Sequence, residues 1–171
     1  QASEGIQVQI ETDLPDHTQI HVVPHEIREV LINLIHNAVD AMHEGGSLCL
    51  KTFLSPTHPQ HVCLQIQDTG PGIPEKHLNK IYERFFTTKG AQGTGLGLAV
   101  SKGIIEKNGG FIEVKSQVQG PDQGTSFSLY LPLSAKPKSN EALTEQKPKK
   151  ILIVDDEPNV REILEDLLTA E

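Results

Sequence analysis

Four short polar or glycine-rich blocks interrupt the apolar patterns of this 171-residue chain, and they constrain its fold more than any other feature. In chain order they are Asn33–Ala38, Asp68–Gly72, Phe85–Lys89 and Gly93–Leu98. The first block lies inside a helical pattern, the second follows a strand-like run, and the fourth precedes another helical pattern. Blocks so far apart can act together only if the helices and strands between them pack as one domain. We therefore expect the four blocks to line a common site.

The apolar spacing predicts a sheet covered by helices. Alternation indicates a half-buried strand at Ile6–Ile10, and a short apolar run suggests another at Ile20–Val23. Helical spacing extends from about Glu26 to Met42 and is followed by two glycines that end the helix. Further strands are expected at 48–53, 62–68, 111–114 and 126–131, and further helices at 77–82 and 96–106. This order predicts an α+β fold, a two-layer sandwich in which helices cover one face of a mixed sheet.

Composition excludes several classes of protein. The formal net charge of −8 argues against nonspecific binding to nucleic acid or to an acidic membrane. No run approaches the about 20 apolar residues that span a bilayer, so we expect no transmembrane segment in this chain. Cys49 and Cys63 lie in strand-like runs and are expected to be free, buried thiols. Free thiols fit a reducing compartment, which predicts a cytoplasmic location.

Together the four blocks resemble the N, G1, F and G2 boxes of the ATP-binding catalytic domain of sensor histidine kinases, within the wider gyrase, heat-shock chaperone, kinase and mismatch-repair superfamily. The resemblance covers residues 1–133. It implies the Bergerat ATP-binding fold, with ATP and Mg²⁺ as ligands. It also implies a kinase whose phosphoacceptor histidine lies on separate, upstream dimerisation helices. His25 is a poor candidate for that acceptor because it begins the same helix that carries the first block.

The first block carries two amides suited to phosphate and metal chemistry. Asn33 and Asn37 are four residues apart, so they project from one helix face. Mg²⁺ takes few protein ligands, and the resemblance assigns Asn37 as that ligand. The resemblance places Asn33 where the ATP hydrolases of the superfamily carry a glutamate that acts as the base. An amide cannot accept a proton near neutral pH, so Asn33 favours phosphoryl transfer over hydrolysis. Asp40 stands where many family members carry lysine, and Lys89 is expected to compensate.

The second block is suited to binding a nucleobase. Asp68 ends a strand, and a carboxylate accepts hydrogen bonds but cannot donate them, so it matches the amino group of adenine rather than the carbonyl of guanine. Gly70 and Gly72 allow the backbone to approach the base. Thr125 has two interpretations: a late polar contact beside the adenine, or an ordinary residue at the start of a strand.

The fourth block is suited to phosphates. Its glycines precede a helical pattern, so exposed amides and the positive end of a helix would face an anion. The Thr94 hydroxyl would donate to a phosphate, and Lys89 would neutralise the γ-phosphate. The expected nucleotide contacts in this region are Lys89, Gly93, Thr94, Gly95, Leu96 and Gly97. Residues 75–92 resemble the ATP lid of the family, with Phe85 and Phe86 expected to pin it to the domain.

The last part of the chain differs in composition. Residues 134–149 are rich in Pro, Lys, Ser and Glu, which predicts a linker. Residues 150–171 resemble the first strand and helix of a response-regulator receiver domain, with Asp155 and Asp156 where such domains bind Mg²⁺. Because one strand and one helix cannot bury a core, we expect this unit to be inactive as a receiver.

Two other functions remain open at this point. The first is an ATP-hydrolysing conformational switch like the gyrase and chaperone members, which rapid turnover by the isolated domain would favour. The second is a serine kinase that binds proteins, or a degenerate kinase that acts only as an interaction module. Asn33 disfavours the first function, and the intact blocks disfavour degeneracy.

Overall fold

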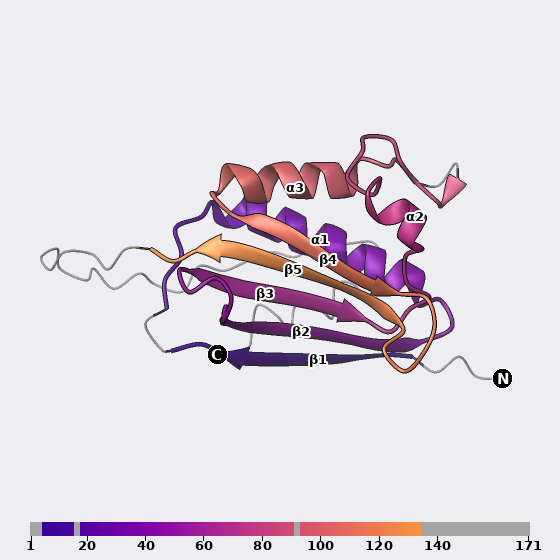
Figure 1. Ribbon diagram of the computed structural model, residues 1–171, viewed down its shortest axis with the longest axis horizontal. Coiled ribbons are helices and arrows are strands. Elements are labelled where there is room, and N and C mark those ends of the chain that lie inside the picture. The colour runs from indigo at the N-terminus through magenta and orange to yellow at the C-terminus, as the bar shows by residue number, and fades with distance from the viewer. Residues whose placement is uncertain (1–4, 16–17, 91–92, 135–171) are drawn as a thin grey trace, which may run out of the picture. The chain divides into compact units, whose positions relative to one another are not determined.

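The computed structural model describes residues 5–15, 18–90 and 93–134, which form a five-stranded mixed sheet with helices on one face (Figure 1). The order of strands across the sheet is β1-β2-β3-β5-β4. β1 is parallel to β2, and every other neighbouring pair is antiparallel. The strands are β1 (Ile6–Asp13), β2 (Gly46–Leu54), β3 (His61–Asp68), β4 (Phe111–Gln117) and β5 (Gly124–Pro132). This architecture confirms the predicted α+β sandwich.

Two long helices form the second layer (Figure 1). They are α1 (Pro24–Ala41) and α3 (Gly97–Lys107), and the short α2 (Glu75–Leu78) lies between them in the chain. The proline at the start of α1 lacks the N–H that a first helical turn leaves unpaired. Residues three and four apart on α1 share its buried face, which packs on β3 and against α3. The core comprises Val30, Leu34, Ile35, Leu48, Leu50, Ile66, Ile105 and Leu129, all at most 2% exposed.

Two predicted elements were wrong. The run 20–23 forms no strand, only a single bridge between Ile20 and Leu133. Val23 is extended because it precedes Pro24, and it serves as the N-cap of α1. The helix predicted over 77–82 is the four-residue α2, which begins and ends earlier. β1 forms where it was predicted, but its expected half-burial was wrong: Val8 and Ile10 are 38% and 42% exposed, and β1 lies at the edge of the sheet.

The cysteines are free, as predicted, although only Cys63 is fully buried. Burial raises the pKa of the Cys63 thiol, which keeps it protonated at neutral pH. Within the described ranges, no helix has the length and apolar character to cross a membrane. The predicted linker, apart from Ser134, and the receiver-like residues 150–171 lie outside the described residues.

Candidate functional site

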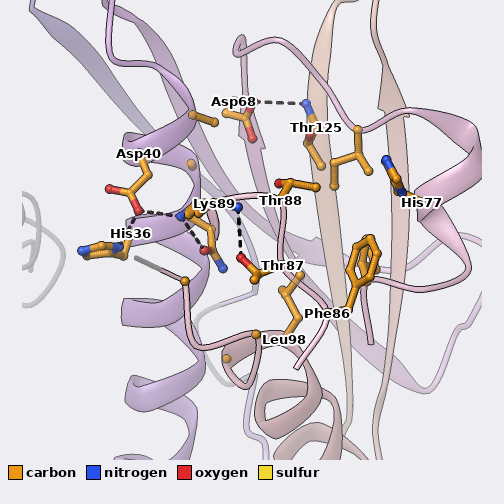
Figure 2. A pocket seen from close by; sticks show the side chains of 18 of the residues that line it. His36, Asp40, Asp68, His77, Phe86, Thr87, Thr88, Lys89, Leu98 and Thr125 are labelled. Atoms are coloured by element: carbon orange, nitrogen blue, oxygen red, sulfur yellow. Dashed lines mark hydrogen bonds and ion pairs between the residues drawn. The ribbon is translucent and has the colours of Figure 1, made fainter. Parts of the chain in front are cut away.

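A cavity of about 560 Å³ opens between α1, the end of β3, β5 and the segment that leads into α3. Its volume is that of a small-molecule site. All four blocks contribute to its lining, and Figure 2 shows their side chains converging from different elements. The lining includes Asn33, Asn37, Asp68, Gly72, Lys89, Gly93, Thr94, Gly95, Gly97 and Thr125. The structure thus brings together most of the residues that the sequence indicated.

Asp68 is a buried acceptor at one end of this cavity. Its side chain lies at the end of β3 and is 5% exposed. The Oδ1 atom accepts hydrogen bonds from the backbone N–H groups of Gly70, at 2.9 Å, and Thr125, at 3.2 Å. No described residue donates to Oδ2. Burial raises the pKa of Asp68, and the two backbone hydrogen bonds oppose that rise. One oxygen is therefore fixed by the protein, and the other can accept a further hydrogen bond.

Asn33 joins α1 to the start of α3. Its Nδ2 donates to the Oγ of Ser101 at 2.9 Å, and Ser101 is 1% exposed. A Cβ atom added at Gly97 would lie 2.1 Å from the Asn33 Oδ1, so a larger residue there would displace the Asn33 side chain. The close approach brings the N-terminus of α3, with its unpaired amides, to the cavity wall. Asn33 is thus held as a neutral amide beside the place where an anion would bind.

Lys89, the last residue of the third block, reaches across to α1 (Figure 2). Its Nζ lies 3.3 Å from the Asn37 Oδ1 and 2.5 Å from the Asp40 Oδ2. The Nδ1 of His36 lies 3.2 Å from the same Asp40 oxygen. These side chains are partly exposed, and exposed ion pairs contribute about 0–1 kcal/mol. The Lys89–Asp40 ion pair can therefore be broken at small cost.

Two predicted contact residues lie beside the cavity rather than in its lining. Gly70 is buried, and its N–H is used by Asp68. Leu96 is 36% exposed, and its N–H donates to the Thr94 Oγ1 at 3.4 Å. Their neighbours Gly72, Thr94, Gly95 and Gly97 do line the cavity.

The two phenylalanines of the third block have different environments. Phe86 lines the cavity, and its ring centroid lies 5.4 Å from that of His77. Phe85 is 73% exposed, so the prediction that it pins this segment to the domain was wrong. The reason is its backbone: a φ of 69° at Phe85 directs the side chain outward, while its N–H donates to the Gly95 carbonyl at 2.8 Å. A left-handed non-glycine residue costs about 1–3 kcal/mol and is typical of functional segments.

Sequence reasoning missed several residues of the site. Thr87 and Thr88 line the cavity and belong to the third block, so their place in the site could have been predicted from the sequence. Ser101 and Ser116 carry no comparable signal. Each is a serine in an ordinary helix or strand pattern, and each becomes important only through a partner on another element: Asn33 on α1 for Ser101, and Thr125 on β5 for Ser116.

Comparison with known proteins agrees with this geometry. The family described as histidine kinase-, DNA gyrase B-, and HSP90-like ATPase matches residues 5–135. Sensor kinase CckA of Brucella abortus is 38% identical in an alignment of 162 residues, and the match covers 80% of this chain and 17% of that protein.

Solved structures give the same result. The catalytic domain of histidine kinase ThkA superposes with a TM-score of 0.63 at 34% identity, over 74% of this chain and 80% of that one. Full-length ShkA in complex with AMPPNP superposes with a TM-score of 0.64 at 28% identity, over 76% of this chain and 26% of that one.

The fold and the cavity thus define an ATPase-type domain in which a buried carboxylate and a helix N-terminus face one pocket. The chain belongs to the histidine kinase-, DNA gyrase B-, and HSP90-like ATPase family, and its similarity within that family includes catalytic domains of sensor histidine kinases. It spans less than a fifth of the length of CckA.

Proposed function

We propose that this chain binds Mg-ATP and transfers the γ-phosphoryl group to a histidine on a separate dimerisation domain in two-component signal transduction. The observation that carries the proposal is Asp68, a buried carboxylate whose Oδ1 is fixed by two backbone N–H groups at the end of the cavity. The remaining oxygen is a pure acceptor, which suits the amino group of adenine. The similarity to ShkA, solved with AMPPNP, supports an adenine nucleotide as the ligand.

The proposed roles divide along the cavity. At the base end, Asp68 accepts from adenine, Gly72 and Thr125 form the wall, and Gly70 holds the Asp68 carboxylate through its N–H. At the phosphate end, Asn37 is the Mg²⁺ ligand; phosphate oxygens and water would complete the coordination. When bound, Mg²⁺ neutralises charge on the phosphates. The remaining phosphate contacts are Asn33, Lys89, Gly93, Thr94, Gly95 and Gly97, and Leu96 lies beside them.

Phosphoryl transfer is favoured over hydrolysis by the environment of Asn33. Efficient hydrolysis needs a base that accepts a proton from water, and a neutral amide cannot do so. The Asn33 amide is also committed to Ser101 and packed against Gly97. We therefore assign Asn33, Asn37 and Lys89 to positioning and charge stabilisation, which dominate phosphoryl transfer. The alternative, a hydrolytic conformational switch, lacks a candidate base at this position.

The proposal implies particular partners and surroundings. The acceptor histidine would lie on dimerisation helices of the same protein, upstream of residue 1. Residues 150–171 would begin a receiver domain after a linker at 134–149. A kinase that draws on cellular ATP would place this domain in the cytoplasm.

Isothermal titration tests the binding half of the proposal. The chain should bind ATP in the presence of Mg²⁺ and bind GTP at least about tenfold more weakly, because guanine presents a carbonyl to Asp68. Steady release of phosphate by the isolated chain should be negligible. Equal affinity for ATP and GTP would contradict the role of Asp68, and rapid turnover would favour the hydrolytic alternative.

Lys89→Ala should weaken ATP binding roughly fivefold and ADP binding much less, because the ammonium is assigned to the γ-phosphate. The affinities of both nucleotides can be measured by the same titration. Lys115→Ala provides a control, since Lys115 is exposed on β4 and outside the cavity lining. If the loss of affinity were equal for ATP and ADP, the assignment of Lys89 to the γ-phosphate would be wrong.

A further inference from the structure

Ser116 forms a hydrogen-bond junction behind the base end of the cavity. It lies on β4 directly opposite Thr125 of β5. Its Oγ is 2.7 Å from the N of Ile73, 2.8 Å from the carbonyl O of Gly124 and 3.0 Å from the Thr125 Oγ1. One hydroxyl thus connects β4, β5 and the loop that follows Asp68.

The donors and acceptors at this junction can be assigned by counting hydrogens. A serine hydroxyl has one hydrogen to donate and two lone pairs that accept. The Gly124 carbonyl can only accept, so the Ser116 hydrogen is donated to it. The Ile73 N–H can only donate, and it occupies one lone pair of Ser116. Only a lone pair remains for Thr125, so the Thr125 hydroxyl is the donor in the bond between the two side chains.

This assignment determines what Thr125 presents to a ligand. Thr125 lines the cavity and is 6% exposed. Its backbone N–H donates to the Asp68 Oδ1, and its hydroxyl hydrogen points to Ser116. Both of its donors are therefore used inside the protein. The only hydrogen-bonding capacity that Thr125 has left for a ligand is therefore that of an acceptor, as at the Asp68 Oδ2.

We infer that Ser116 is a specificity-determining positioning residue, which fixes the Thr125 hydroxyl as an acceptor so that the base end of the cavity selects a purine with an amino group at C6. This inference rests on the proposed binding of ATP and deepens it. Ser116 does not touch the base; it acts through Thr125. A ring with a carbonyl at C6 meets acceptors from both Thr125 and Asp68, which disfavours its binding.

The experiment compares ATP with inosine triphosphate, which carries a carbonyl at C6 and a hydrogen on N1, by titration with Mg²⁺. The wild type should prefer ATP. In Ser116→Ala the Thr125 hydroxyl is free to rotate and donate, so ATP affinity should fall roughly three- to tenfold while inosine triphosphate affinity falls less. The ratio of the ATP affinity to the inosine triphosphate affinity should therefore fall toward one. An equal loss for both nucleotides would show a merely structural role and overturn the inference.

Matched variants keep the test decisive. Ser126→Ala removes the neighbouring hydroxyl, which is buried and has no hydrogen-bond partner among the described residues, and it should leave the ratio unchanged. Ser116→Thr retains a hydroxyl and should restore the wild-type ratio. If Ser116→Ala does not fold, Thr125→Val must narrow the ratio in its place, and an unchanged ratio there overturns the inference.

The two levels of the proposal fail in different ways. A wild type that binds neither nucleotide overturns the proposed function and this inference together. A wild type that prefers ATP, with the same preference in Ser116→Ala and Thr125→Val, overturns only the role of Ser116.

Discussion

Asp68→Asn is expected to weaken ATP binding by roughly 30- to 300-fold while the domain stays folded. The substitution preserves shape, so the side-chain oxygen can still accept from Gly70 and Thr125. The new NH₂ group then points into the cavity, where a donor faces the amino group of adenine. Loss of a charge-assisted hydrogen bond, combined with two opposed donors, accounts for this magnitude. The affinity for inosine triphosphate should rise relative to that for ATP, because the C6 carbonyl can accept a hydrogen bond from the side-chain amide of the variant.

The same variant should be more stable than the wild type at pH 7 when no nucleotide is bound. The pKa of Asp68 is raised by burial, so the folded state holds the proton more tightly than the unfolded state, where the ordinary value is 3.8. Deprotonation therefore removes folding stability as the pH rises through the folded-state pKa. A neutral asparagine avoids this cost. The stability difference should shrink as the pH is lowered toward 3.8.

Urea denaturation from pH 7 downward, together with titration of ATP and inosine triphosphate, measures both effects. Asp122→Asn is a suitable control, because it removes an exposed carboxylate between β4 and β5 and outside the cavity lining. Wild-type ATP affinity in Asp68→Asn would refute the assignment of this carboxylate to adenine. A variant that is less stable than the wild type at pH 7 would contradict the linkage between burial and pKa.

Gly124→Ala is expected to lower the free energy of unfolding by about 3 kcal/mol or more. Gly124 has a φ of 139°, a conformation that residues with a side chain rarely adopt. An added Cβ would lie 2.0 Å from the carbonyl O of Asp68, which is backbone and cannot rotate away. The clash would separate the ends of β3 and β5 and displace Asp68. ATP binding should therefore fall in the same variant.

Gly103→Ala is the matched control for that experiment. Gly103 lies inside α3, and no atom comes within 4 Å of a Cβ added there. Alanine should stabilise the helix by about 0.5–1 kcal/mol, since glycine is entropically costly in a helix interior. Urea midpoints that move in opposite directions for the two variants are the expected result. Equal midpoints for Gly124→Ala and the wild type would show that the two strand ends separate without cost.

Local patterns predicted the regular elements well where burial is one-sided. α1, β2, β3 and α3 were each found within a few residues, because their apolar periodicity records the face that packs on the core. Prediction failed at Ile20–Val23, where an apolar run lies next to a proline and makes only one bridge. It also failed at Phe85, because an aromatic residue predicts burial and a left-handed backbone cannot be seen in residue types.

The candidate site shows the same division. Asn33, Asn37, Asp68 and the glycines could be selected from sequence because their chemistry and order are informative together. The pairing of Lys89 with Asp40 could not, although both residues had been noted, because it depends on how one segment crosses to α1. Where the predicted contacts lie relative to the cavity, with Leu96 beside it and Gly97 in its wall, also depends on the path of the backbone.

The sequence alone thus determined the α+β class, the main elements and the residue types able to recognise a purine triphosphate, because periodicity and chemical type are local properties of the chain. Only the tertiary structure decided which oxygen of Asp68 is free and which way the Thr125 hydroxyl points. Those two facts follow from the register between β3, β5 and β4, which sets Asp68 opposite Thr125 and Thr125 opposite Ser116. Hydrogen-bond direction depends on partners brought together by folding, and no single residue or motif contains that information.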